Sequence, residues 1–243
     1  MKTTKYIYIL AVAMLAFTAC KKYDNYDEPD AGVHGKIIDA ETGNTIETKQ
    51  PGGGSVRFLQ WNPKYPSPQP LDVSIKADGN YSVKRFFADK YKAFPLNGPF
   101  MYSGDSVEVS LTHNGDAELN FEVVPYYRIE ASVVDSTFTY TINRSAFNTS
   151  KLVEIRFMIN NYPIVNEDVS SNFDESSYYL NSWRVFTEGT PDNELLGMSR
   201  TFTFNFSRTR WPKGDYYFRV AARAANSPNS TYNYSPVIKA TVR

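Results

Sequence analysis

The sequence predicts an all-β protein made of two tandem antiparallel β-sandwich domains. Apolar and polar residues alternate along most of the chain after residue 20, which is the pattern of half-buried strands, and no window there keeps the 3.6-residue period of an amphipathic helix. The chain contains 18 Tyr and 16 Phe, and aromatic residues are enriched in strands. Short strands with frequent turns between them are typical of antiparallel sandwiches.

The first half of the chain contains the strands of one expected sandwich, over residues 32–125. Turn signals such as Asp78-Gly79 and Asn114-Gly115 separate these strands, and such pairs supply the positive φ values that tight hairpins need. The predicted strands span residues 32–39, 54–60, 71–75, 80–86, 90–94, 106–111 and 117–124.

The second half contains the strands of another expected sandwich, over residues 126–243. Between residues 162 and 182 the sequence is polar and poor in β pattern, which predicts an inserted loop, and loops of that length are more often functional than incidental. The predicted strands span residues 127–134, 137–143, 152–160, 183–187, 200–207, 214–224 and 237–242.

Residues 1–19 have the pattern of a signal peptide. A basic start is followed by an apolar run over residues 6–17, which is long enough for a signal peptide and short for a bilayer-spanning helix. Cys20 follows this run and is the one cysteine of the chain, so it has no disulfide partner within it. The tetrapeptide Phe17-Thr18-Ala19-Cys20 resembles a bacterial lipobox, which implies lipidation of Cys20 and a membrane as partner. An ordinary signal peptide with an incidental cysteine is the alternative.

Residues 20–31 predict a flexible tether. This stretch has no hydrophobic period, contains Pro29 and carries several acidic residues, including Asp27 and Glu28. It resembles the acidic segment that directs Bacteroidetes lipoproteins to the outer face of the outer membrane, which implies a location at the cell surface. A charged linker without a sorting role is the alternative.

Short motifs in both halves resemble known domain families. Residues 33–43, VHGKIIDAETG, and residues 78–83, DGNYSV, resemble the first strand and a hairpin of a carboxypeptidase-regulatory-like, or transthyretin-like, domain. Residues 211–222, with Tyr216, resemble the tyrosine corner of a fibronectin type III or immunoglobulin-like domain. This order resembles a family of Bacteroidetes outer-membrane lipoproteins that carry a domain of unknown function and accompany starch-utilisation-type receptor and transporter proteins. The resemblance implies a place in polysaccharide-utilisation loci, a role in capturing glycans, and these proteins as partners.

The residues themselves indicate no enzyme. The chain contains no G-x-S-x-G, H-E-x-x-H, C-x-x-C or P-loop motif, and the two histidines, His34 and His113, stand at strand and turn positions typical of the surface. We therefore expect no cofactor and no metal. The 26 basic and 26 acidic residues balance, which argues against nucleic acid as a partner. A hydrolase that uses a pair of carboxylates is the remaining enzymatic alternative, and the carboxylates considered for it are Glu154, Glu167, Asp168, Asp174 and Glu175.

Aromatic residues in turn-rich regions are candidates for glycan binding. Sugar rings stack on aromatic faces while amides and carboxylates bond their hydroxyl groups. The predicted contacts lie beside the proline-rich loop after residue 60, in the turn region near residue 100, and at the end of the inserted loop: Trp61, Tyr65, Phe100, Tyr102, Tyr178, Tyr179 and Trp183.

Two functions follow from these patterns. The first is a non-catalytic surface lipoprotein that assists polysaccharide capture and uptake and binds glycans through these loop aromatics. The second is a structural or adhesive module that contacts other outer-membrane proteins, in which case the same rings cap the two cores. Trp211 and Tyr216 are predicted to be core residues in either case, because they stand at and after the turn that leads into a central strand.

Overall fold

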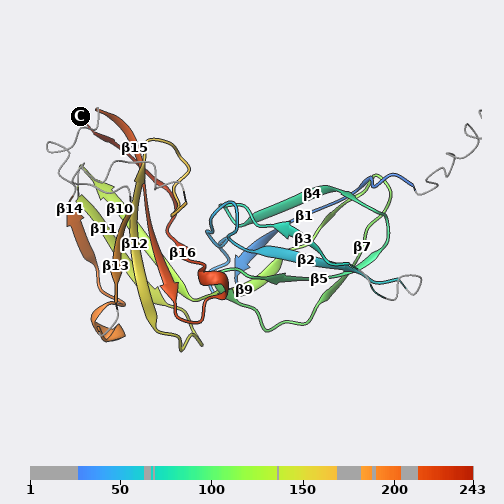
Figure 1. Ribbon diagram of the computed structural model, residues 1–243, viewed down its shortest axis with the longest axis horizontal. Coiled ribbons are helices and arrows are strands. Elements are labelled where there is room, and N and C mark those ends of the chain that lie inside the picture. The colour runs from blue at the N-terminus through green and yellow to red at the C-terminus, as the bar shows by residue number, and fades with distance from the viewer. Residues whose placement is uncertain are drawn as a thin grey trace, which may run out of the picture.

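The computed structural model describes most of the chain after the N-terminal segment: residues 27–62, 67, 69–135, 137–168, 182–187, 190–203 and 213–242. Within these ranges the regular secondary structure is almost wholly β, and the strands form two sandwiches that lie end to end (Figure 1). The prediction of an all-β fold with two tandem β-sandwiches is confirmed. No helix of the described part is long and apolar enough to cross a bilayer.

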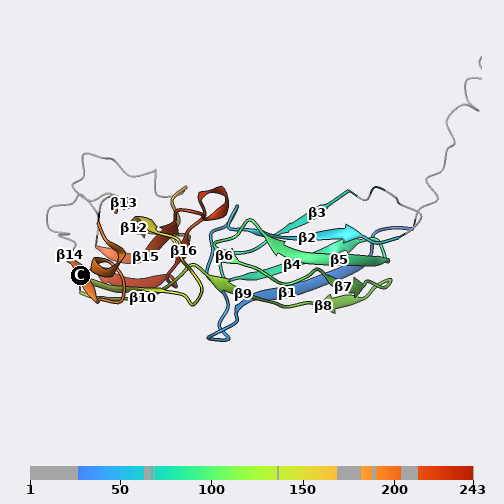
Figure 2. The ribbon, with the colours of Figure 1, turned by 90° about the horizontal axis from the view of Figure 1, so that it is seen from below.

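The first sandwich is built from strands β1 to β9. One sheet has the order β3-β2-β5-β7, and the other has the order β4-β1-β9-β6 with β8 also paired to β1. Figure 2 shows the two layers, with β2 and β3 on one side and β1 and β8 on the other. The bounds are β1 (Ala31–Asp39), β2 (Ser55–Gln60), β3 (Leu71–Ser74), β4 (Asn80–Phe86), β5 (Lys90–Leu96), β6 (Phe100–Met101), β7 (Val107–Ser110), β8 (Asp116–Glu118) and β9 (Phe121–Pro125).

Strand β1 differs from its neighbours because it pairs in parallel with β8 and β9, whereas the other ladders are antiparallel. Parallel partners need a long crossover connection, and residues 40–115, which include all four strands of the opposite sheet, provide it. Alternate residues of β1 such as Val33 and Ile37 are fully buried. They face a core of aromatic rings in edge-on contact, with Phe86 5.0 Å from Phe58 and 5.2 Å from Tyr91 between ring centroids.

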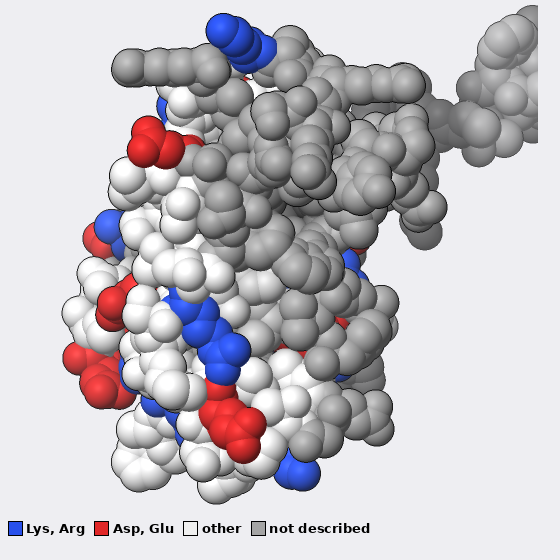
Figure 3. Space-filling view, turned by 90° about the vertical axis from the view of Figure 1, so that its left-hand side faces the viewer, with Lys and Arg blue, Asp and Glu red and all other residues white. Residues whose placement is uncertain are grey.

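The second sandwich is built from strands β10 to β17. Its sheets have the orders β10-β11-β14 and β13-β12-β15-β16, with β17 also paired to β15. Figure 3 shows its end that faces away from the first sandwich, where side chains of both charges are interspersed among uncharged ones in the described part. The bounds are β10 (Tyr127–Val134), β11 (Thr137–Arg144), β12 (Leu152–Asn160), β13 (Ser182–Phe186), β14 (Arg200–Thr203), β15 (Gly214–Ala224), β16 (Asn233–Tyr234) and β17 (Ile238–Val242).

The predicted strands agree closely with the observed ones, except that one predicted strand is divided into two. Strands β4, β10, β12 and β15 have the predicted bounds. The predicted strand 117–124 is split into β8 and β9, because the chain bends at Leu119 and Asn120. There Leu119 N donates to His34 O, and Asn120 Oδ1 accepts from Lys36 N, so β1 changes partner at this point. Strands β6 and β16 were not predicted, since two residues are too few to show an alternating pattern.

Candidate functional site

The loop between β1 and β2, residues 40–54, belongs to the first sandwich and contacts the second. Lys49 Nζ lies 2.7 Å from Glu167 Oε1 and 2.9 Å from Asp168 Oδ2. Beside this contact, Asn166 Nδ2 donates to Gln50 O at 3.3 Å. The first residues of the predicted inserted loop, which begins near residue 162, therefore join the two sandwiches.

A second contact across the junction is a two-pronged ion pair between Arg128 of β10 and Asp39 of β1. Arg128 Nε lies 2.5 Å from Asp39 Oδ2, and Nη2 lies 2.8 Å from Oδ1. Arg128 Nη1 lies 2.8 Å from Glu41 Oε2. Burial by itself raises the pKa of Asp39, but the hydrogen bonds from Arg128, Glu41 N and Thr42 and the charge of Arg128 outweigh it, so the pKa is lowered. Asp39 is therefore held as a carboxylate.

Replacing Asp39 with asparagine is expected to weaken the dependence of stability on pH on the acid side. A carboxyl with a lowered pKa in the folded state contributes stability above its unfolded value, near 3.8, and loses that contribution as the pH falls through the folded pKa. Urea unfolding at pH 7 and at pH 2.5 (about one unit below the unfolded value) should show the variant less stable at pH 7, with the difference shrinking at the lower pH. A constant difference at both pH values, or an equal effect of Glu122→Gln at an exposed β9 carboxyl, would contradict this role.

Arg219 of β15 makes the most deeply buried charged contact of the junction, with 2% of its side chain exposed. Its Nη2 donates to Glu47 Oε2 at 2.8 Å, and its Nε donates to Ser235 O at 2.8 Å. The guanidinium carbon lies 4.3 Å from the centre of the Tyr234 ring. Burial lowers the pKa of Arg219 and raises that of Glu47, so at both partners burial outweighs their mutual attraction.

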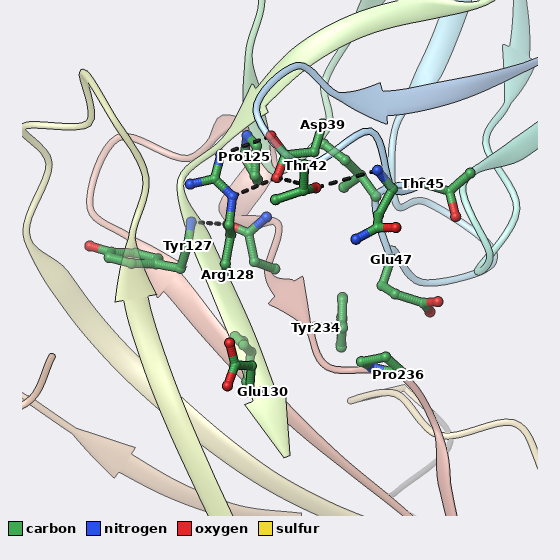
Figure 4. A pocket seen from close by; sticks show the side chains of 14 residues that line it. Asp39, Thr42, Thr45, Glu47, Pro125, Tyr127, Arg128, Glu130, Tyr234 and Pro236 are labelled. Carbon is green, nitrogen blue, oxygen red and sulfur yellow. Dashed lines mark hydrogen bonds and ion pairs between the residues drawn. The ribbon is translucent and has the colours of Figure 1, made fainter. Parts of the chain in front are cut away.

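A cavity of about 230 Å³ opens between these contacts (Figure 4). From the first sandwich, it is lined by Asp39 and by the β1–β2 loop as far as Glu47. The second sandwich lines it with the start of β10, including Arg128 and Glu130, with β16, and with Pro236, two residues after the end of β16. The cavity therefore depends on both sandwiches.

A second candidate site surrounds Trp61, at the end of the first sandwich opposite the junction. The Trp61 side chain is 57% exposed, and Lys92 Nζ lies 3.8 Å from the centre of its ring. Lys92 Nζ also lies 3.8 Å from Glu108 Oε1, on the same outer face of the sheet. This exposed indole with a cation on one face and a carboxylate beside it is named the Trp61 platform below.

Polar side chains continue from the Trp61 platform into the adjoining loop end. Asp89 accepts hydrogen bonds from Gln60 Nε2 at 2.6 Å and from Asn62 Nδ2 at 3.0 Å. The backbone N–H of Trp61 donates to Lys90 O at 2.7 Å. The indole is therefore held by strand pairing on a well-bonded end of the sheet, and amide groups lie next to it in sequence.

The first sandwich is similar to a known protein family. Residues 31–124 match the family model described as "Protein of unknown function (DUF3823) N-terminal domain". The first sandwich is therefore similar to the N-terminal domain of DUF3823 proteins. None of the curated proteins matches the chain.

Solved structures show the same fold over both sandwiches. A DUF3823 family protein from Bacteroides uniformis is 20% identical, covers 88% of this chain and 100% of its own, and superposes with a TM-score of 0.68. A DUF3823 family protein from Parabacteroides merdae is 19% identical, with 89% and 100% covered and a TM-score of 0.65. A third protein, from Bacteroides uniformis and named "putative carbohydrate binding protein", is 22% identical, with 88% and 100% covered and a TM-score of 0.67.

The predicted aromatic contacts fall into different places in the structure. Trp61 is exposed at the end of the first sandwich. The prediction needs correction for Phe100, which is 5% exposed and packs in the core of that domain. Tyr102 is half-buried, because its ring packs edge-on against Phe121 and its hydroxyl donates to Asp105 O at 2.8 Å. The remaining predicted residues, and the lipidation site, lie outside the described residues: Cys20, Tyr65, Tyr178, Tyr179, Trp211 and the side chain of Trp183.

The carboxylates considered for hydrolysis lie in ion pairs where the structure describes them. Glu154 is fully buried, 2.7 Å from Arg156 Nε and 3.1 Å from Arg223 Nη2. Glu167 and Asp168 bind Lys49 of the first sandwich. Asp174 and Glu175 lie outside the described residues. Among those described, no three His, Cys, Asp or Glu residues gather as a metal site would require.

The histidines lie at the surface of the first sandwich, as predicted. His34 Nδ1 lies 3.1 Å from Asp116 Oδ1, and His113 Nδ1 lies 3.1 Å from Asp30 Oδ1. More than two fifths of each imidazole side chain is exposed, at 45% for His34 and 56% for His113. Both rings therefore make local contacts with a neighbouring carboxylate at the surface of the first sandwich.

Sequence reasoning missed the residues of the junction. Arg219 carried the one usable signal, because it stands between Phe218 and Val220 inside a predicted central strand. A charged side chain in such a strand is almost never fully buried unless it is paired. Its partner Glu47, 172 positions away in the chain, lies in a predicted loop and carried no signal of its own.

Proposed function

We propose that this protein is a non-catalytic surface lipoprotein that binds glycans and assists polysaccharide capture and uptake. The observation that supports this most directly is the Trp61 platform, since a large exposed indole on an ordered strand end is a typical surface for a sugar ring. The name of the third structural neighbour points to the same class of ligand. The platform is also one of the sites that the sequence predicts.

The geometry of the Trp61 platform suits a pyranose ring. The apolar C–H face of a sugar can cover the indole, and this contact removes apolar surface from water on both sides. Lys92 stacks on the ring with a cation–π contact, which contributes about 0.5–1 kcal/mol at exposed sites and holds the ring in one orientation. Glu108 and the neighbouring Asn62 can then bond sugar hydroxyls at the rim.

The position of the Trp61 platform fits a protein attached through Cys20. Ala31 enters the first sandwich beside Phe86, and Asp30 lies against His113, so the chain arrives at the same end as Trp61 (Figure 1). A tether of about 11 residues spans at most about 40 Å. A lipid on Cys20 would hold the platform near the outer membrane, where we place the protein beside a starch-utilisation-type receptor and transporter. The transthyretin-like and fibronectin-like domain types are part of the same proposal.

Replacing Trp61 with alanine is expected to weaken binding of a soluble polysaccharide by about tenfold to a hundredfold, because aromatic anchors contribute most of the energy at such sites. Isothermal titration of residues 21–243, which contain both cores, with plant and host polysaccharides measures this. Tyr162→Ala is the matched control, since Tyr162 is 64% exposed on the second sandwich, and it should bind as the parent does. Equal loss in both variants, or no binding by the folded parent, would contradict the proposal.

The alternative, a structural or adhesive module, predicts a different result. Such a module should retain an outer-membrane protein in an affinity pull-down without any sugar, and the retention should survive Trp61→Ala. The membrane anchor is tested separately by the intact mass of the protein from membranes. An acylated chain that begins at Cys20 is expected, and an unmodified chain that begins at Met1 would exclude the anchor.

A further inference from the structure

The cavity at the junction has the position and size of a small ligand site. Ligand sites occur preferentially where two domains meet, and this cavity is bounded by β1 and its loop on one side and by β10 and β16 on the other. Its volume of about 230 Å³ lies below the roughly 300–1,000 Å³ typical of sites for drug-sized ligands. It therefore suits a single small ring rather than a long chain segment.

The polar groups of the cavity divide into those already engaged and those left for a ligand. Arg128 is engaged, since its Nε, Nη1 and Nη2 all bind Asp39 or Glu41. Glu47 uses Oε2 for Arg219, and its Oε1 has no partner among the described residues. Glu130 is exposed and, within the described part of the chain, forms no ion pair. The groups left for a ligand are thus mainly carboxylate oxygens.

The β1–β2 loop adds neutral polar groups to these carboxylates. The side chains of Asn44 and Thr45 line the cavity. Their amide and hydroxyl groups make no hydrogen bond within the described ranges, whereas the Asn44 backbone N–H is bonded to Thr42 Oγ1 at 3.3 Å. An amide and a hydroxyl each both donate and accept. Such groups match the mixed donors and acceptors of sugar hydroxyls.

The floor of the cavity is apolar and rigid. It is formed by Pro236 and by the ring of Tyr234, which in Figure 4 lies between Glu47 and Glu130. Tyr234 is 5% exposed, its hydroxyl bonds Glu167, and Arg219 stacks on its ring. A ring held on two sides loses little freedom when a ligand covers its exposed edge, so the site is preorganised.

The charge of the cavity selects against acidic ligands. Three carboxylates, Asp39, Glu47 and Glu130, line it against one guanidinium, that of Arg128. The positive charge of Arg219 lies behind Glu47 and is buried. An anionic ligand would meet a net negative surface, whereas hydroxyl groups can donate hydrogen bonds to the free carboxylate oxygens.

We propose that the junction cavity binds one neutral, hydroxyl-rich sugar ring, held between the two sandwiches and distinct from the Trp61 platform. The two sites lie at opposite ends of the first sandwich (Figure 1), so each can bind without the other. The ring would bridge the β1–β2 loop and β10, so its binding also stabilises the junction.

The test is titration of residues 21–243 with glucose, galactose, mannose and glucuronic acid, followed by ligand-observed NMR. At least one neutral sugar should bind and glucuronic acid should bind about tenfold more weakly or not at all. Glu130→Gln and, separately, Asn44→Ala should each weaken binding about tenfold. This is the effect expected from weakening or losing one hydrogen bond to the sugar, from the carboxylate in the first variant and from the amide in the second. Glu122→Gln, at an exposed glutamate of β9, is the matched control and should leave binding unchanged.

Trp61→Ala separates this inference from the proposed function. If neutral sugars bind the Trp61→Ala variant as they bind the parent, and Glu130→Gln or Asn44→Ala removes that binding, the junction site is supported, whatever the polysaccharide result. If Trp61→Ala abolishes binding of single sugars while the junction variants keep it, the ring binds at the platform and the junction site is overturned. Binding of glucuronic acid as tight as that of glucose, or no binding of any sugar by the folded parent, also overturns it.

Discussion

Replacing Arg219 with alanine is expected to lower the free energy of unfolding by about 3–5 kcal/mol, the usual cost of removing one partner of a buried ion pair. The guanidinium is 2% exposed and binds Glu47, Ser235 O and Val165 O. Without it, two carbonyl oxygens and a half-buried carboxylate lose their donor. Urea unfolding followed by circular dichroism measures the change.

Two further variants show whether the effect comes from the buried pair. Lys239→Ala removes an ion pair between β17 and Asp215 of β15, whose partners are 54% and 46% exposed, and such exposed pairs contribute little to stability. The double variant Arg219→Met with Glu47→Leu removes both charges, and should be more stable than Arg219→Ala, because no uncompensated charge remains. A loss for Arg219→Ala no larger than that for Lys239→Ala would contradict the structural role given to Arg219.

Gly35→Ala is expected to destabilise the first sandwich by about 3 kcal/mol or more, at or beyond the upper end of the cost of overpacking. A Cβ on Gly35 would lie 1.8 Å from Leu119 O and 2.9 Å from Tyr81 Oη. The obstacle is backbone, not a flexible side chain, and the Tyr81 hydroxyl itself bonds Leu119 O. The substitution therefore forces β1 away from the bend between β8 and β9.

Gly43→Ala is the contrasting variant for this prediction. Gly43 has φ +73° with nothing within 4 Å of an added Cβ, so its cost is limited to the left-handed backbone, about 1–2 kcal/mol. Urea unfolding should rank Gly35→Ala clearly below Gly43→Ala in stability, and hydrogen exchange should show faster opening of β1. Equal losses in the two variants would mean that the close approach of Leu119 is relieved at little cost.

The strands could be predicted where alternation was long and turns were explicit. β4 follows the Asp78-Gly79 turn, where Gly79 has φ +78°, and β15 begins at Gly214, so both strands begin where predicted. The exposed Trp61 could be proposed because its loop is rich in proline. Phe100 could not be distinguished from it, since both stand beside turn residues and only packing reveals which ring is buried.

The sequence by itself determined the β class, the strands longer than three residues and the absence of the usual catalytic motifs, because these depend on local period and residue type. The tertiary structure decided which aromatic ring is exposed and which charged groups meet. Asp39 and Arg128 are 89 positions apart, and Glu47 and Arg219 are 172 apart. Their pairing arises where the two sandwiches meet, and no local pattern along a chain encodes a contact between surfaces that only folding creates.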